Sequence, residues 1–433
     1  MKKLLKVIAV IGFVFQFAIL SCSFSPKKMD DSNLLKDFPP LEWSDDYVFG
    51  STLYPPRICV WNSQNGKLIR QYDFFRAGSS DSFFKNGGKW LRLKAENLQP
   101  VNKSIWFITY GNQCSLVKLN LETGKIKSVD LKQEFDYIAF IPEANGGEGA
   151  ILVVPFAQYK QNVYIRLFDL EMNLLQEYVL EPSDLHILTA EGQYKDGFYY
   201  FCASCHCDVK SPEPADGTYK IIKLNLSSSD YEIINLKTNQ LFASNFIDTN
   251  MPTLRKEYYS TSFSVKPGKS DNGNFMVAVD FIGGDVGRFL FETNDLSEAK
   301  FSYTGKKLLY SDKVEVFPRM YFQMNENYSM IGNYCGDLYA IFYGESKDDI
   351  VFIPDAEPSF CMKDNSVWSA KNPYKYSSAS DEWILDGEGM YKIDIENNSV
   401  YLYSSDGLCT KLNPTVFQKE SHLNSLNLGV DVQ

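Results

Sequence analysis

The stretch SLVKLNLETGKIKSVDL, residues 115–131, decides the fold that this sequence predicts. Apolar and polar residues alternate on both sides of Thr123 and Gly124, and a period of two is typical of a half-buried β-strand. Glycine accepts the positive φ angle that a tight hairpin turn requires. The stretch therefore predicts two antiparallel strands joined by a short turn.

The same strand–turn–strand pattern recurs along the chain, and its turns lie 49 to 67 residues apart. A further apolar strand precedes most of the hairpins, so each repeat holds three or four strands. Repeats of this size are typical of a β-propeller, because a twisted sheet covers its two faces only by stacking on its neighbours. The seven turns centre on Gly66, Gly124, Asn173, Ser228, Asp295, Ser346 and Asn397.

We therefore expect an all-β fold, a β-propeller of four-stranded antiparallel sheets with seven blades, and six or eight blades as alternatives. Stacked β-sandwiches are the competing interpretation, but they lack a period of roughly 50 residues. The propeller is expected to span residues 41–411, and residues 412–433 form a C-terminal tail or a ring-closing segment. The wide gap at 245–273 predicts a long loop or an added hairpin, where Tyr258 and Tyr259 are candidates for binding.

The N-terminus has the features of an export signal. Three lysines precede an apolar run from Val7 to Leu20, which is too short to span a bilayer but suits the central region of a signal peptide. The run ends at Ile19-Leu20-Ser21-Cys22, which resembles the bacterial lipobox. That resemblance implies cleavage before Cys22 and attachment of a diacylglycerol, with further acylation such as palmitate. An ordinary secretory signal with a chance cysteine is the alternative.

This pattern predicts a signal peptide at residues 1–21 and a flexible, polar tether at 22–40. The mature protein is then held to the bacterial cell envelope by its lipid, on the extracytoplasmic side. Ser23 is not acidic, which favours the outer membrane in a Gram-negative cell.

The turn LETGK at residues 121–125 is similar to those of quinoprotein-like and YVTN-type blades. Together with the lipobox, it makes the chain resemble the envelope-anchored β-propeller lipoproteins of bacteria. The resemblance spans most of the chain from Leu41 to Ser405 but lacks the WD, YWTD and sialidase sequence boxes. It implies a fold and a location rather than one function, because propellers carry many functions.

Charge narrows the range of partners. The chain holds 54 acidic and 43 basic residues, for a formal net charge of −11. Such a surface repels nucleic acid and anionic lipid headgroups, so contact with the membrane is expected only through the lipid anchor. Aromatic residues reach 15%, and the group GFYYF at 197–201 is either a stacking platform for a ligand or packing between blades.

The stretch Cys202-Ala203-Ser204-Cys205-His206 spells the Cys-x-x-Cys-His motif of covalent haem attachment. In that interpretation Cys202 and Cys205 form thioethers and His206 is the proximal iron ligand. A zinc site that adds Cys207 is a second interpretation. Buried thiols or disulfides that stabilise the region are the third, so we expect no cofactor, with haem c as the alternative.

Common catalytic motifs are missing from the sequence, including His-Glu-x-x-His, Gly-x-Ser-x-Gly and the P-loop. Only His186, His206 and His422 are available for histidine chemistry. We therefore expect a binding or assembly module for an envelope protein, peptide or glycan, with no catalytic residue and no metal site assigned. A haem redox protein is the alternative, and a propeller hydrolase or lyase with carboxylates near the central channel is a further one.

Overall fold

The computed structural model describes most of the chain between Leu35 and Leu412. The stretches within these limits that it does not describe are 53–56, 77–88, 91, 94–98, 111–113, 133–134, 136, 156–161, 182–184, 206–218, 238–259, 266–272, 284, 298–299, 311–319, 325–327, 333–337, 343–349, 354–355, 364–365, 372, 378–381, 386, 395–396 and 398. The expected signal peptide, Cys22, Tyr258, Tyr259 and residues 413–433 lie outside the described residues.

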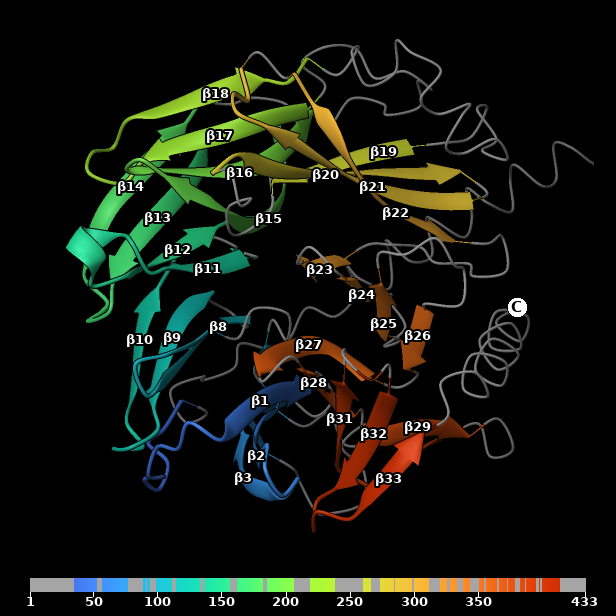
Figure 1. The fold of residues 1–433 in the computed structure, drawn as a ribbon. Coiled ribbons are helices and arrows are strands. Elements are labelled where there is room, and N and C mark those ends of the chain that lie inside the picture. The colour runs from blue at the N-terminus through green and yellow to red at the C-terminus, as the bar shows by residue number, and fades with distance from the viewer. Residues whose placement is uncertain are drawn as a thin grey trace, which may run out of the picture.

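Within the described residues, the chain forms seven antiparallel sheets of three to five strands, which follow one another in sequence (Figure 1). The first sheet contains β1 (Tyr47–Thr52), β2 (Arg57–Asn62) and β3 (Leu68–Asp73). The second contains β6 (Arg92–Leu93), β7 (Gln99–Val101), β8 (Ser104–Tyr110), β9 (Ser115–Asn120) and β10 (Ile126–Asp130). The third contains β11 (Tyr137–Ile141), β12 (Ala150–Val154), β13 (Val163–Asp169) and β14 (Leu174–Leu180).

The later sheets repeat this meander. The fourth contains β15 (Leu185–Lys195), β16 (Phe198–Cys205), β17 (Tyr219–Asn225) and β18 (Tyr231–Asn235). The fifth contains β19 (Ser260–Val265), β20 (Phe275–Gly283), β21 (Asp285–Thr293) and β22 (Ser302–Tyr310). The sixth contains β23 (Met320–Met324), β24 (Tyr328–Gly332), β25 (Leu338–Phe342) and β26 (Ile350–Ile353). The seventh contains β27 (Ala356–Lys363), β28 (Ser366–Lys371), β31 (Gly389–Asp394), β32 (Ser399–Ser404) and β33 (Cys409–Leu412).

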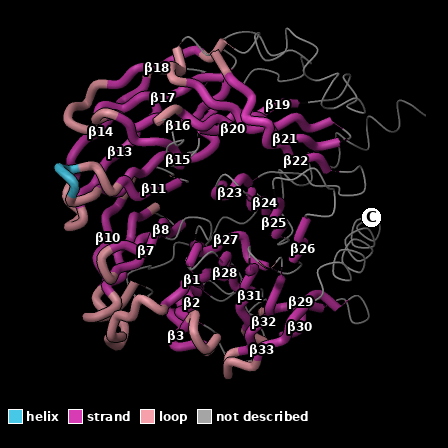
Figure 2. Tube along the Cα trace, viewed as in Figure 1, coloured by secondary structure: helices cyan, strands magenta, loops and turns pink. Residues whose placement is uncertain are grey.

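Two small ribbons complete the strands of the described residues. They are β4 (Phe75–Arg76) with β5 (Lys89–Trp90), and β29 (Tyr374–Ser377) with β30 (Glu382–Leu385). A short 3₁₀ turn, η3 (Asn145–Gly147), is the cyan segment in Figure 2. In the part of the chain that the structure describes, no helix has the length and apolar character needed to cross a membrane.

All seven hairpins expected from the sequence are present as antiparallel pairs. Several of their turns are held by a side chain at the end of the preceding strand. Asn120 Oδ1 accepts the backbone N–H of Thr123 at 2.9 Å, and Asp169 Oδ1 accepts two turn N–H groups at 2.8 Å each. Asparagine and aspartate favour turns because their side chains replace the missing backbone acceptors. The pairs are β2–β3, β9–β10, β13–β14, β17–β18, β21–β22, β25–β26 and β31–β32.

The cores lie between neighbouring sheets. Strand alternation sends one set of apolar side chains to each face, and each face can then pack against a neighbouring sheet. Phe74 of the first sheet contacts Phe107 of the second, with ring centroids 5.2 Å apart. A separate core joins the second and third sheets, and another joins the third and fourth.

The first and seventh sheets also pack on each other, although they lie at opposite ends of the described chain (Figure 1). Val48 and Trp61 share one buried cluster with Trp368 and Met390. Gly50 is required at this contact, because a Cβ there would lie 2.8 Å from the Cβ of Ala370. The succession of meanders, with the first packed on the last, is the arrangement of a β-propeller and confirms the all-β prediction. The number of blades stays a prediction.

The segment from Leu35 to Asp46 packs on the first two sheets. The Phe38 ring lies 5.0 Å from that of Tyr72, and its backbone N–H donates to the Gly124 carbonyl at 2.8 Å. Residues 35–40 were expected to belong to a tether, so the folded body begins earlier than the expected boundary at Leu41. The reason is Phe38, whose apolar ring gains more from burial than the polar context of the segment suggested. In the gap at 245–273, β19 supplies the first strand of the fifth sheet.

A partly buried ion pair joins the first and seventh sheets. Arg57 Nε lies 2.5 Å from Asp73 Oδ1, and its Nη1 bonds Glu388 Oε1, just before β31. The side chains of Arg57 and Glu388 are 17% and 19% exposed. Burial raises the pKa of Glu388 despite the lowering effect of Arg57. The pair therefore links the first and seventh sheets, and Arg57 offsets part of the cost of burying the Glu388 carboxylate.

Replacing Arg57 by glutamine should destabilise the protein in a pH-dependent way. The variant leaves the Glu388 carboxylate partly buried without its cation, at an expected cost of about 2 kcal/mol near pH 8. A raised pKa means that the folded state holds the proton more tightly, so the penalty grows as pH rises through that pKa and shrinks toward about pH 5. Urea unfolding at both pH values measures the difference. The Arg57→Gln/Glu388→Gln double variant, which removes the stranded charge, should lose this pH dependence; an equal loss for both variants at both pH values would contradict the pairing.

Candidate functional site

A row of polar side chains crosses the whole of the fourth sheet on one face. Gln193 lies opposite Tyr200 in the register of β15 and β16, Tyr200 lies opposite Lys223 of β17, and Lys223 lies opposite Glu232 of β18. Directly opposite residues on antiparallel strands point to the same face. That face meets the fifth sheet, because the Tyr200 ring packs edge-on against Phe275 of β20 at 4.8 Å.

The opposite face of the same sheet shows what packing alone favours. The neighbouring register row runs through Tyr194, Tyr199, Leu224 and Tyr231, all aromatic or aliphatic. These side chains belong to the core that the fourth sheet shares with the third. The polar row therefore departs from the apolar pattern of an inter-sheet face. Departures of this kind concentrate at functional sites, because they cost stability without improving packing.

Two lysines on this face, Lys223 of the row and Lys195, lie over aromatic rings. Lys223 Nζ is 3.0 Å from Glu232 Oε2 and 4.5 Å from the centroid of the Phe198 ring. Lys195 Nζ lies 4.6 Å from the centroid of the Phe275 ring. Ring faces attract ammonium groups, so these contacts fix both lysines beside the tyrosine.

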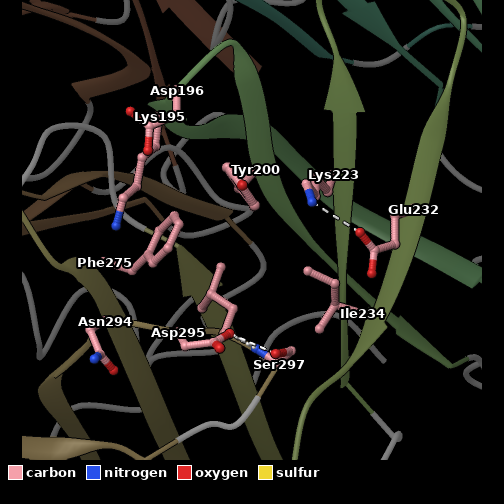
Figure 3. A pocket seen from close by; sticks show the side chains of 11 residues that line it. Lys195, Asp196, Tyr200, Lys223, Glu232, Ile234, Phe275, Asn294, Asp295 and Ser297 are labelled. Carbon is pink, nitrogen blue, oxygen red and sulfur yellow. Dashed lines mark hydrogen bonds and ion pairs between the residues drawn. The ribbon is translucent and has the colours of Figure 1, made fainter.

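A hollow of about 220 Å³ lies between the fourth and fifth sheets, and its lining includes Lys195, Tyr200, Lys223, Glu232 and Phe275. Figure 3 shows the Lys223–Glu232 pair on one side of it and the turn after β21 on another. In that turn Asp295 Oδ1 accepts the Ser297 N–H at 2.8 Å. The hollow thus opens at the rim formed by the hairpin turns, and both sheets contribute to its wall.

Tyr200 and Lys223 both keep their protons near neutral pH. Burial raises the pKa of the Tyr200 phenol, so it stays a neutral donor. The hydrogen bond to Glu232 raises the pKa of Lys223, so it stays charged. A general acid or base needs a pKa close to the working pH, and both shifts move away from it. The arrangement suits hydrogen bonding to a ligand better than proton transfer.

At the inner end of the row, the amide oxygen of Gln193 is a buried acceptor without a donor among the described residues. Gln193 is 1% exposed, and its Nε2 donates to the Asn274 carbonyl at 3.4 Å. No donor among the described residues reaches its Oε1. A buried acceptor without a donor costs about 1–3 kcal/mol, which again marks this face as one that stability alone does not explain.

The residues of the haem motif fall on the same strand. Cys202 lies in β16, buried at 1% exposed, and Cys205 ends that strand. His206 and Cys207 lie outside the described residues. A thioether at Cys202 requires its sulfur to reach a haem edge, and the strand would have to leave the sheet for this to happen. Cys202 is the one haem-binding residue of the motif whose side chain the structure describes, and the haem interpretation stays a prediction.

No metal site was assigned from the sequence, and the zinc interpretation rested on the same motif. Within the described residues, no group of three or more histidine, cysteine, aspartate or glutamate side chains is placed to hold a metal ion. The GFYYF group divides between two faces of the sheet. Tyr199 and Phe201 are buried in the core with the third sheet, whereas Tyr200 lines the hollow and Phe198 lies under Lys223 on the same face.

Sequence reasoning missed Lys223 and Glu232. Their pairing follows from the β17–β18 hairpin, whose turn at Ser228 was recognised, so counting outward from the turn would have placed them opposite each other. Their alignment with Tyr200 and Gln193 had no sequence signal, because it depends on the register of β15 and β16 against that hairpin.

Comparisons with known proteins add general likenesses only. No family model matches the chain, and no curated protein sequence matches it. Solved structures that it resembles include the Dos1 propeller, with 10% identity, a TM-score of 0.37 and 83% of this chain against 74% of that one. Hydrazine synthase of Kuenenia stuttgartiensis shows 11% identity, a TM-score of 0.41 and coverage of 88% and 98%. A quinoprotein alcohol dehydrogenase-like protein of Bacteroides thetaiotaomicron shows 9% identity, a TM-score of 0.38 and coverage of 86% and 76%.

Removing the ion pair of the polar row should leave stability almost unchanged. Glu232 is 58% exposed at its side chain, so the Lys223→Met/Glu232→Gln double variant should change the free energy of unfolding by less than about 1 kcal/mol. Urea unfolding measures this change. The Lys103→Met/Glu122→Gln variant removes a second exposed pair, 2.6 Å apart on the second sheet, and serves as the matched control. A much larger loss at the row would assign these charges to structure rather than to function.

Proposed function

We propose that this protein is a lipid-anchored, extracytoplasmic binding or assembly module whose partner is an envelope protein, peptide or glycan. The ligand would bind at the hairpin-turn rim, in the hollow between the fourth and fifth sheets. The observation that carries the proposal is the polar row from Gln193 to Glu232 on a face where sheet packing favours apolar residues. Its Tyr200 and Lys223 offer donors, and Glu232 and Asp295 offer acceptors.

The donors of the hollow support binding as its role. Tyr200 and Lys223 both hold their protons more tightly than usual. Hydrolases and lyases need an acid or a base that exchanges a proton near neutral pH, and neither of these two side chains does so easily. Fixed donors and acceptors instead give a ligand a defined orientation.

The anchor and the site would act together. The described chain enters the fold at Leu35 beside the β9–β10 turn, where Phe38 and Leu41 bond the carbonyls of Gly124 and Leu121. In the repeated meander, this turn is equivalent to the β21–β22 turn that carries Asp295. An extended chain covers at most about 3.5 Å per residue, so a short tether from Cys22 would keep this rim close to the membrane.

The binding role predicts a selective loss of affinity. The mature chain, prepared without its lipid, is screened against arrays of soluble oligosaccharides and peptides and against solubilised envelope proteins. Its ligand should bind the Lys223→Met/Glu232→Gln variant about tenfold more weakly, because two charged hydrogen-bonding groups are lost. The Lys103→Met/Glu122→Gln control should bind like the unchanged chain. Equal affinity in both variants would place the site elsewhere, and ligand turnover that the row variant abolishes would make the protein an enzyme.

The anchor predicts a mass. Native protein extracted from its own membranes should carry a lipid adduct on a chain that begins at Cys22, as measured by intact mass spectrometry. The Cys22→Ser variant should lose the adduct and leave the membrane fraction. The same spectrum would show a haem-sized adduct if Cys202 and Cys205 carried one. A mature chain without lipid would overturn the anchored part of the proposal and leave the binding part to the previous test.

A further inference from the structure

A second hollow lies on the other side of the fourth sheet. It measures about 470 Å³ and opens between the third and fourth sheets, again at the hairpin-turn rim. Its wall comes from the β11–β12, β13–β14, β15–β16 and β17–β18 turns and the residues beside them. The polar and aromatic groups in it include Glu143, Asn145, Gln176, Tyr194 and Ser227.

A single turn separates the two hollows. Tyr194 and Lys195 are consecutive residues at the end of β15, so strand alternation points them to opposite faces of the sheet. Tyr194 accordingly lines the second hollow, and Lys195 and Asp196 line the first. Gly197, at φ 86°, completes the turn, and a Cβ at this residue would meet no atom within 4 Å. No side chain therefore projects from Gly197 into the space beside this turn.

The chemistry of both hollows suits a ligand that is rich in hydroxyl groups. Carboxylate, amide and hydroxyl side chains supply most of the lining, and a carboxylate retains acceptor capacity when one of its bonds is used. The two linings together hold two lysines and four carboxylates, so their net charge is negative and would repel a polyanion. An uncharged sugar offers several O–H donors per unit and meets no such repulsion.

The direction of the groove argues against a peptide bound as an added strand. Such a peptide would lie parallel to a free strand edge and use its backbone N–H and C=O groups. The two hollows instead follow one another from sheet to sheet, across the strand direction, and are joined over a turn. Side-chain donors and acceptors, rather than a sheet edge, would make the contacts.

We infer that the two hollows are subsites of one groove that binds a linear, uncharged glycan across the β15–β16 turn. This inference rests on the proposed binding function and specifies its ligand. A typical small-molecule site has a volume of about 300–1,000 Å³; the hollow of about 220 Å³ lies below this range, and the hollow of about 470 Å³ lies in its lower half. A chain of sugar units occupies both, and the second contact is gained without the full entropic cost of a separate binding event.

The test measures affinity against ligand length. Neutral linear oligosaccharides, from single sugars to octasaccharides, are titrated calorimetrically into the mature chain and into two variants. Gln176→Ala perturbs the hollow between the third and fourth sheets, and Lys223→Met/Glu232→Gln perturbs the other. Tyr194→Ala is a stronger change in the same hollow as Gln176→Ala, but it also removes a ring that packs against the core. Gln176→Ala is therefore used if the Tyr194→Ala variant does not fold.

We expect affinity to increase at least about tenfold once the glycan is long enough to reach both hollows. Each variant should reduce the affinity for long glycans, whereas a short glycan should respond to one variant only. An affinity that does not depend on length, or a long glycan that responds to one variant only, would overturn the two-subsite groove and leave the binding function in place. A peptide or protein ligand that depends on Lys223 and Glu232 would overturn the glycan assignment alone. A ligand of any class that binds both variants unchanged would overturn the site and the inference together.

Discussion

The packing of one sheet face against the next is the interaction on which the rest of this structure depends. The inner strands of the first three sheets bury side chains on both faces, and the cover comes from the neighbouring sheets. Such a series is complete only when its ends meet, because an uncovered terminal sheet would expose an apolar face. The contact of Trp61 with the Trp368 cluster, and the Arg57–Glu388 pair beside it, supply that closure.

Because faces between sheets favour apolar side chains, the polar row is an exception that packing does not explain. A lysine, a tyrosine phenol and a glutamine amide on an inter-sheet face take the place of apolar groups that would pack better. The fourth sheet shows both choices on its two sides: aromatic rings toward the third sheet and hydrogen-bonding groups toward the fifth. The other cores among the described sheets are apolar, so the fold tolerates the cost at one face. A rigid wall on both sides then holds the donors and acceptors in place.

Much of the architecture was predictable because the signals for it are local. The alternation around Gly124 and the turn residues Asn120 and Asp169 are local signals, so strands and turns of this kind could be derived from the sequence. The beginning of the folded body was less accessible, since Phe38 sits in a polar segment and its burial depends on Tyr72 and Phe74. The Cys202 motif shows the limit of spacing alone: the spacing resembles that of haem attachment, the strand β16 that carries Cys202 is an inner strand of its sheet, and the haem alternative stays a prediction.

The sequence by itself determined the repeat, the hairpins, the all-β class and the acidic surface. These follow from the period of the side chains and from composition, which need no knowledge of distant contacts. The tertiary structure alone decided which faces meet and which rows align. Gln193, Tyr200 and Glu232 are separated along the chain, and only the register of four paired strands brings them into one line beside Phe275. A slip of one residue would turn each of them to the opposite face, so the site exists only once the sheets are assembled.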